Sequence, residues 1–213
     1  MPKELISPGV SEYLESLVPK RAPELARMER HARKTRFPII GPAVGHLCYL
    51  LARTIGAKRV FELGSGFGYS TAWFARAVKE NGGGVVHHVV WDEELSLQAR
   101  GHLDALGLGD QVRYAVGEAV EALSREDGEF DLIFNDIDKR GYPAALAVIQ
   151  SKLRRGGLLI TDNLLWSGRI FDAKNRTPDT QGVRKLTSLV MKSPNWTASI
   201  VPIRDGVLVA RKN

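Results

Sequence analysis

Three oxygen-bearing side chains follow two apolar segments of this sequence. Asp136 comes after the segment 130–134, and Asp162 and Asn163 come after the segment 158–161. Two carboxylates and an amide carbonyl are hard oxygen ligands that suit Mg²⁺ or another octahedral cation, which keeps some of its waters. Asp and Asn are also favoured capping residues. The same three residues are therefore equally compatible with caps on the segments that follow them.

A lysine, Lys139, lies three residues after Asp136. A lysine close to a bound cation can have a lowered pKa and can act as a general base. The alternative is a solvent-exposed lysine without a chemical role, which is the commoner outcome on composition alone.

A second candidate site is the stretch RVFELGSGFGYST, residues 59–71. Gly64, Gly66 and Gly68 form a G-x-G-x-G turn, and glycine lets the backbone turn tightly and approach a ligand closely. The third glycine comes one position earlier than in the dinucleotide fingerprint. Glu62 just before the turn would repel a pyrophosphate, so the pattern favours a cationic or zwitterionic ligand. The alternative is a turn that only joins a strand to a helix.

These candidates need a sheet to bring them together, and the sequence predicts one. From residue 58 onward strands and helices alternate, which indicates a parallel sheet with helices on both faces. Ligands of such sheets bind outside the carboxyl ends of the strands. A short Asp205-Gly206 turn predicts a hairpin of the last two strands. The expected strands are a strand ending at 63, then 85–90, 112–116, 130–134, 158–161, 198–203 and 207–211; the expected helices are 69–79, 93–106, 118–123, 142–153 and 181–192.

The first 57 residues predict a helical cap on this core, and the whole chain, 1–213, is interpreted as one domain. Helices are expected at 9–19, 22–35 and 42–55. The segment 37–40 is expected to be a loop because Pro38 interrupts it. We expect the loops 37–45 and 166–180 to form the walls of a substrate pocket.

The composition limits the possible partners. The 213 residues carry a net charge of +6, but the basic residues are dispersed and do not alternate with aromatics, so a nucleic-acid surface is not favoured. No apolar run is long enough for a membrane helix, and the start of the chain does not resemble a secretory signal. The only cysteine, Cys48, is expected to pack in the core. We therefore expect a cytoplasmic protein.

Four blocks of this sequence together resemble a known family. FELGSGFGYST, FNDIDKRGY, ITDNLLWSGRI and VPIRDGVLVARK occur in that order, and the similarity covers residues 39–212. They resemble the cation-dependent O-methyltransferases, which include catechol and caffeoyl-coenzyme A O-methyltransferases. The resemblance implies a Rossmann-like α/β fold with a mostly parallel seven-stranded sheet, an antiparallel C-terminal strand, helices on both faces and an N-terminal helical extension.

The resemblance also implies roles for the candidate residues. Asp136, Asp162 and Asn163 match divalent-metal ligands. Lys139 matches the lysine near the reacting hydroxyl. Asp136 is also expected to take part in catalysis and in cofactor binding. The positions that match the part of the family motif holding the methionine of S-adenosylmethionine are Glu62, Gly64, Gly66, Gly68 and Ser70. A homodimer is also implied.

The sequence departs from the family where the second and third strands end. The family has an acid at the end of the second strand that holds the ribose, and Val90 stands there. Asp92 is expected to take over the ribose, or Trp91 to stack on the adenine. After the third strand, Glu118 replaces the usual aspartate.

The resulting hypothesis is methyl transfer from S-adenosylmethionine to a hydroxyl of a small catechol-like aromatic, with Mg²⁺ or another divalent cation. One alternative is a metal-independent methyltransferase that acts on RNA or another large acceptor. Another is a non-catalytic nucleotide-binding homologue.

Overall fold

A computed structural model describes residues 6–213; residues 1–5, part of the expected cap and of the segment judged not to be a secretory signal, lie outside the described residues. Seven strands form one sheet in the order β3-β2-β1-β4-β5-β7-β6. Only β7 runs against its neighbours β5 and β6, which confirms the predicted sheet. The strands are β1 (Arg59–Leu63), β2 (Val85–Val90), β3 (Val112–Val116), β4 (Phe130–Asn135), β5 (Leu153–Thr161), β6 (Trp196–Val201) and β7 (Val207–Lys212).

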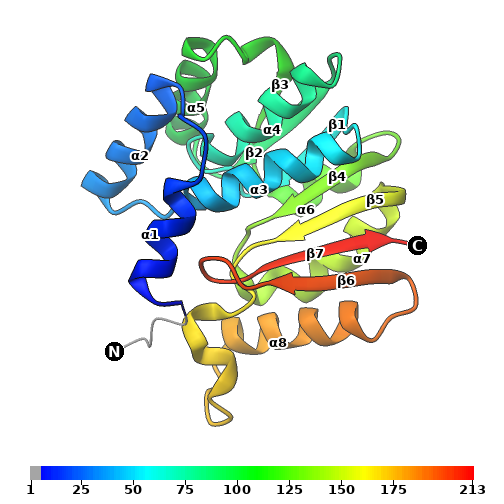
Figure 1. Ribbon diagram of the computed structural model, residues 1–213. Coiled ribbons are helices and arrows are strands. Elements are labelled where there is room, and N and C mark those ends of the chain that lie inside the picture. The colour runs from blue at the N-terminus through cyan, green and yellow to red at the C-terminus, as the bar shows by residue number, and fades with distance from the viewer. Residues whose placement is uncertain (1–5) are drawn as a thin grey trace.

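Helices cover both faces of this sheet (Figure 1). One hydrophobic core joins α2, α3 and α4 to the sheet, and the other joins α6, α7 and α8 to its opposite face. None of the helices within residues 6–213 has the length and apolarity that crossing a membrane requires. The helices are α1 (Pro8–Ser16), α2 (Pro23–Thr35), α3 (Gly41–Thr54), α4 (Tyr69–Glu80), α5 (Glu93–Ala105), α6 (Ala119–Arg125), α7 (Tyr142–Lys152) and α8 (Pro178–Met191), with 3₁₀ turns η1 (Gly109–Gln111), η2 (Lys139–Gly141) and η3 (Trp166–Phe171).

The central strands are buried on both faces, as the apolar runs in the sequence predict. In β1, Val60 packs in the first core, whereas Phe61 and Leu63 pack in the second. Cys48 is fully buried in the first core, which confirms its expected packing role.

One boundary was wrong in the sequence analysis. We expected residues 142–153 to be helical and the next strand to begin at 158, but β5 begins at Leu153. Leu153 is buried and pairs with Phe130 of β4 before the register shifts. Gly157 then passes close to β4, since a Cβ there would lie 2.8 Å from the carbonyl oxygen of Asp131. The glycines permit a close strand pairing rather than ending the helix.

Two further boundaries differ for local reasons. Helix α8 begins at Pro178, three residues earlier than predicted, because proline is well suited to the first turn of a helix. The predicted hairpin is present, but β6 ends at Val201 and pairs there with Val207. Residues 202–206 therefore form a five-residue loop, longer than the expected Asp-Gly turn.

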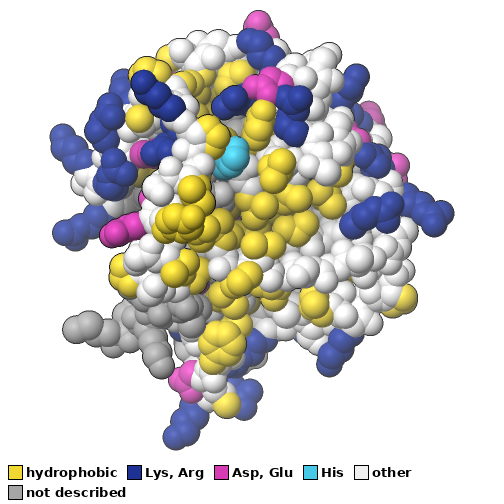
Figure 2. Space-filling view, viewed as in Figure 1, with side chains coloured by type: hydrophobic (Ala, Val, Ile, Leu, Met, Phe, Trp, Pro, Cys, Tyr) yellow, Lys and Arg dark blue, Asp and Glu magenta, His cyan; other side chains and the backbone are white. Residues whose placement is uncertain are grey.

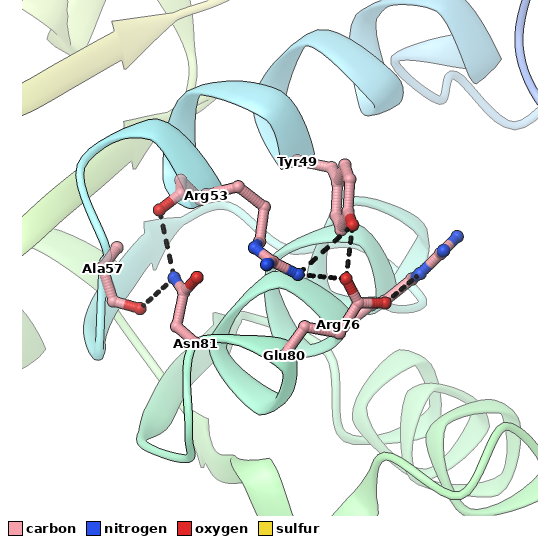
Figure 3. Close-up of polar contacts among 7 residues, drawn as sticks. Tyr49, Arg53, Ala57, Arg76, Glu80 and Asn81 are labelled. Atoms are coloured by element: carbon pink, nitrogen blue, oxygen red, sulfur yellow. Dashed lines mark hydrogen bonds and ion pairs between the residues drawn. The ribbon is translucent and has the colours of Figure 1, made fainter.

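Polar contacts hold α3 against α4 (Figure 3). The Asn81 side-chain amide donates to the carbonyl oxygens of Ala52 and Ala57, at 3.1 and 2.9 Å. Glu80 accepts hydrogen bonds from Tyr49 and from Arg53. These contacts fix the end of α3, whose beginning adjoins the segment 37–40.

Candidate functional site

The ends of β1 and β4 meet at the carboxyl edge of the sheet. The backbone N–H of Asp136 donates to the carbonyl oxygen of Leu63 at 2.9 Å. Gly64, which follows Leu63, has φ +87°. A Cβ on Gly64 would lie 2.7 Å from the carbonyl oxygen of Asp136. Only glycine fits both the backbone conformation and this contact, so the turn and Asp136 are held side by side.

A cleft with about 290 Å³ of empty space, partly open to solvent, lies beside this contact. Gly64, Gly66, Ser70 and Asp136 line it, together with the segment 37–40. The segment 37–40 and the glycine turn lie close together, since a Cβ on Gly66 would be 3.1 Å from the Phe37 ring. The structure thus brings four of the predicted site residues to one cleft, and it places part of the expected pocket loop there too.

Gly68, predicted with the other two glycines, has a different neighbour. Its φ is +90°, and a Cβ there would lie 2.8 Å from the Cβ of Ala99 on α5. This glycine therefore allows α5 to pack against the start of α4, and it does not line the cleft described above.

Glu62 is fully buried directly before the turn. Burial, helped by the charge on Asp136, raises the pKa of its carboxyl from 4.5 to about 7. The hydroxyls of Ser70, Thr71 and Ser65 oppose this rise, although neither carboxylate oxygen accepts a hydrogen bond of ordinary geometry. A buried carboxylate without full hydrogen bonding is costly, so the folded protein favours the protonated form of Glu62 or a donor beside it.

Lys139 is held against Asp136 and is mostly buried, with 13% of its side chain exposed. Its ammonium donates to Asp136 Oδ1 at 2.7 Å and to the carbonyl oxygen of Ile137 at 3.2 Å. It also lies 5.3 Å from the ring centre of Tyr142 and 5.9 Å from that of Trp166. The structure therefore favours a defined site for this lysine over the alternative of an exposed one.

Two residues that the sequence analysis missed shape the position of Lys139 and Asp162. A Cβ on Gly182 of α8 would lie 2.1 Å from the carbonyl oxygen of Lys139, so α8 packs directly on η2. The buried Tyr142 hydroxyl donates to the carbonyl oxygen of Asp162 at 3.0 Å. A glycine inside a predicted helix was the available signal for Gly182; nothing local indicates the Tyr142 contact.

Asp162 directly follows β5 and is 1% exposed. Its Oδ2 accepts from Arg204 at 2.7 Å, whereas its Oδ1 has no hydrogen-bond partner. Burial raises the pKa of this carboxyl to about 6; Arg204 opposes the rise, and the nearby charge of Asp136 adds to it. The alternative role as caps does not describe Asp136 or Asp162, because the N-caps of the helical segments that follow them are Asp138, Gly141 and Leu165. Both carboxylates pair with basic side chains instead.

Asn163 takes a left-handed backbone conformation, with φ +64°. Its side-chain amide donates to Asp205 Oδ2 at 3.0 Å, and Asp205 Oδ1 accepts from the backbone N–H of Ser167 at 2.6 Å. Asp205 thus engages the nitrogen of the Asn163 amide and leaves its oxygen for another partner. The sequence analysis treated Asp205 only as a turn residue and missed this contact.

The expected cation set fits a divalent metal ion in the chemistry of its donors. It offers two carboxylates and an amide oxygen, and Asp162 Oδ1 is a buried acceptor without a partner. No group of three His, Cys, Asp or Glu side chains suited to a metal occurs in the part of the chain that the structure describes. Lys139 and Arg204 already pair with one oxygen of each carboxylate.

The residues expected near a nucleoside lie after β2 and β3 and do not line the cleft described above. Trp91 is 70% exposed. Asp92 caps α5 by accepting from the backbone of Glu94 and Leu95 at 2.8 and 3.2 Å, and Glu118 caps α6. Their contact with a ligand stays a prediction.

Comparisons with known proteins add family relations to this geometry. A family model described as O-methyltransferase matches residues 15–213. Catechol O-methyltransferase of Niastella koreensis is 30% identical over 199 residues, which cover 91% of this chain and 89% of that protein. A putative O-methyltransferase of Mycobacterium bovis is 33% identical over 173 residues, covering 80% and 76%.

Solved structures show the same arrangement. The O-methyltransferase TomG from Streptomyces achromogenes, in complex with SAM, has a TM-score of 0.86 and 26% identity and covers 96% of each chain. An O-methyltransferase from Bacillus cereus, in complex with SAH, has the same TM-score and identity and covers 96% of this chain and 97% of that one. The fold is that of Rossmann-like methyltransferases.

The burial of Glu62 predicts a pH dependence of stability. Its folded pKa of about 7 lies above the ordinary 4.5, so the folded state holds a proton that the unfolded state has lost. Stability is therefore lost as pH rises from about 4.5 to about 7. Glu62→Gln removes this loss, and we expect the ligand-free variant to be more stable than the wild type near pH 8, by on the order of 3 kcal/mol.

Urea unfolding of the wild type and of Glu62→Gln, near pH 8 and near pH 4.5, measures the effect. The free energies of unfolding of the two proteins should become similar near pH 4.5. Asp162 titrates in both proteins, so the difference between them isolates Glu62. A constant difference at both pH values would contradict the prediction.

Proposed function

Because the chain belongs to the O-methyltransferase family, we propose that it transfers a methyl group from S-adenosylmethionine to a hydroxyl of a small catechol-like aromatic, with the help of Mg²⁺ or another divalent cation. The observation that carries this proposal is the shared cleft of the glycine turn and Asp136. A methyl donor bound at the glycine turn would then lie next to the carboxylates and the amide that follow β4 and β5, namely Asp136, Asp162 and Asn163. The catechol O-methyltransferase of Niastella koreensis supports the choice of acceptor.

The glycine turn is the proposed site of the methionine part of S-adenosylmethionine. Gly64 and Gly66 leave their backbone open to the cleft, Ser70 lies at the start of α4, and Glu62 supplies a buried acceptor for the positively charged amino group. Gly68 supports the turn through its packing on α5. The complexes of relatives with SAM and SAH support this assignment.

The nucleoside part is assigned to the ends of β2 and β3. Trp91 exposes its ring beside the start of α5, where it can stack on a base. Asp92 and Glu118 stand at the starts of α5 and α6, after neighbouring strands.

Asp136, Asp162 and Asn163 are the proposed ligands of the divalent cation. Bound there, the cation would accept both oxygens of a catechol and stabilise the phenolate that attacks the methyl group. Tyr142 and Asp205 hold two of these ligands in place through the Asp162 carbonyl and the Asn163 amide. Orientation of this kind can contribute about 7–11 kcal/mol to a bimolecular reaction.

Lys139 and Asp136 are the proposed catalytic pair. The 2.7 Å contact fixes the ammonium beside the carboxylate, and the packing of α8 on η2 limits its movement. From that position the Lys139 ammonium orients the acceptor hydroxyl; once it has given up a proton to solvent, the neutral amine would take up the hydroxyl proton. Asp136 also borders the cleft formed with the glycine turn.

We propose that residues 1–213 act as one methyltransferase domain. The family match begins at residue 15, within the helical cap of residues 1–57. The segment 37–40 of the cap lines the same cleft as the turn in the core of residues 58–213. Substrate binding therefore needs both parts.

A homodimer is proposed from an apolar surface. Figure 2 shows hydrophobic side chains that gather over α3 and the neighbouring strands of the sheet. Leu50 of α3 is 54% exposed, and Leu47, Leu51 and Val209 are only partly buried. A contiguous apolar surface of this kind is typical of an interface between proteins.

Leu50→Lys should weaken this dimer, because it places a charge in the proposed interface. Light scattering of the wild type should give twice the mass of one chain, and the variant should shift toward the single-chain mass. Leu97→Lys on α5, where the side chain is 57% exposed, is the matched control and should stay dimeric. A monomeric wild type contradicts the proposal.

The cofactor site predicts a specific loss on substitution of Gly64. Gly64→Ala puts a Cβ 2.7 Å from the Asp136 carbonyl oxygen at φ +87°, so the turn must shift, and we expect affinity for S-adenosylmethionine to fall at least about tenfold. Calorimetry measures it. Gly82→Ala is the control, since Gly82 has φ +93° but no atom within 4 Å of its Cβ position. Equal affinities in both variants, or no binding by the wild type, would contradict the assignment.

The cation site predicts a loss of turnover when its ligands or the ion are removed. Asp162→Ala, or an excess of chelator, should reduce methylation of a catechol by at least about 10²-fold, because the phenolate loses its stabilising charge. The rate of catechol methylation is measured with a radiolabelled methyl donor. Binding of S-adenosylmethionine to the variant is the control for folding. Full activity after rigorous metal removal would rule out the cation.

A further inference from the structure

Arg204 occupies an unusual position beside Asp162. It lies in the loop 202–206 between β6 and β7, and its guanidinium Nη1 donates to Asp162 Oδ2 at 2.7 Å. The arginine side chain is 37% exposed, whereas that of Asp162 is 2% exposed. The side chain therefore reaches from the rim of the molecule to a buried carboxylate at the end of β5.

The backbone of Arg204 indicates that this contact matters to the folded structure. Its φ is +52°, in the left-handed region that non-glycine residues adopt at a cost of about 1 kcal/mol. Loop hydrogen bonds from Ile203 N–H to the Val201 carbonyl and from Gly206 N–H to the Ile203 carbonyl fix the turn around it. Loss of the arginine side chain would leave a nearly buried carboxylate without its partner, which is destabilising.

The charges around Asp162 are those of Arg204, Asp136 and Lys139. With Lys139 on Asp136 and Arg204 on Asp162, each carboxylate already has a monovalent partner. A divalent cation at Asp162 would lie close to the guanidinium, and like charges at such distances repel strongly in a buried site. Only Asp162 Oδ1, which has no partner, is open to the ion without moving Arg204.

From these contacts we propose that Arg204 is a built-in competitor of the divalent cation: it neutralises Asp162 when no ion is bound, and it weakens the affinity of the site for the ion. This inference rests on the cation site of the proposed function. Arg204 acts through Asp162, so it is a positioning residue that sets metal affinity and takes no part in methyl transfer.

The structure provides room for Arg204 to leave Asp162. Arg204 lines a second cleft, with about 340 Å³ of empty space partly open to solvent, between α1, α3 and the loop 202–206. Ile40, which also lines the donor cleft, belongs to it, and so does Glu15 of α1. A guanidinium that leaves Asp162 therefore faces a cleft that is open to solvent and lined by another carboxylate, Glu15.

Binding of Mn²⁺ to the full chain, measured by calorimetry and by the loss of the free-ion electron paramagnetic resonance signal, tests the proposal. Arg204→Gln removes the competing charge, so Mn²⁺ should bind at least about tenfold more tightly than to the wild type. Arg140→Gln is the matched control, because the exposed Arg140 pairs with Asp138 and does not contact Asp162; its affinity should stay within about twofold.

A second variant distinguishes the loss of the charge from a folding defect. Arg204→Gly removes the charge and also relieves the left-handed backbone, so it should fold and should bind Mn²⁺ more tightly as well. Without metal, in the presence of a chelator, Arg204→Gln should melt at a lower temperature than the wild type. Addition of Mn²⁺ should raise the melting temperature of Arg204→Gln by more than it raises that of the wild type.

The outcomes separate this inference from the proposed function. Equal or weaker Mn²⁺ binding by both Arg204 variants, with a wild type that binds the ion, overturns the role of Arg204 and leaves the cation site standing. Absence of Mn²⁺ binding in every variant, with catechol methylation intact, overturns the cation dependence and the competition together.

Discussion

The contact between the glycine turn and the end of β4 is the constraint on which the site depends. Gly64 and Asp136 approach so closely that a single methyl group on Gly64 would collide with the Asp136 backbone. The contact places the end of β1, with its buried Glu62, against the strand end that carries Asp136 and Lys139. The glycine turn and Asp136 therefore line one cleft, and a direct backbone contact joins them.

Residues that do not line the cleft fix the positions of the other candidate site residues. Gly182 lets α8 press on η2, and Tyr142 anchors the backbone of Asp162 from α7. Asp205 holds the amide of Asn163 from the hairpin loop. Each of these contacts joins segments that are 20 or more residues apart, so the geometry of the site is a property of the packed fold. Side chains held in this way can keep charged groups at short distances in a buried environment.

Much of the fold could be predicted from the sequence, because local patterns determine it. The apolar segments 85–90 and 112–116 became β2 and β3 with the predicted bounds, and the order of strands and helices was confirmed. The start of β5 was wrong because the buried pairing of Leu153 with Phe130 outweighs the local glycine signal. The ends of β4 and β5 did bring Asp136 and Asp162 into the same charged neighbourhood. Arg204 could not be linked to Asp162 from sequence, since 42 residues separate them.

The place of β7 in the sheet has a consequence for how the protein matures. This strand follows all the other described strands in sequence, yet it lies between β5 and β6 and carries the loop with Arg204 and Asp205 at its start. A nascent chain leaves the ribosome from its N-terminus, so β5 emerges with an unpaired edge and with Asp162 lacking its arginine. The edge of β5 and the Asp162 carboxylate therefore stay without these partners until β7 has been translated, so this half of the sheet has an open strand edge during synthesis.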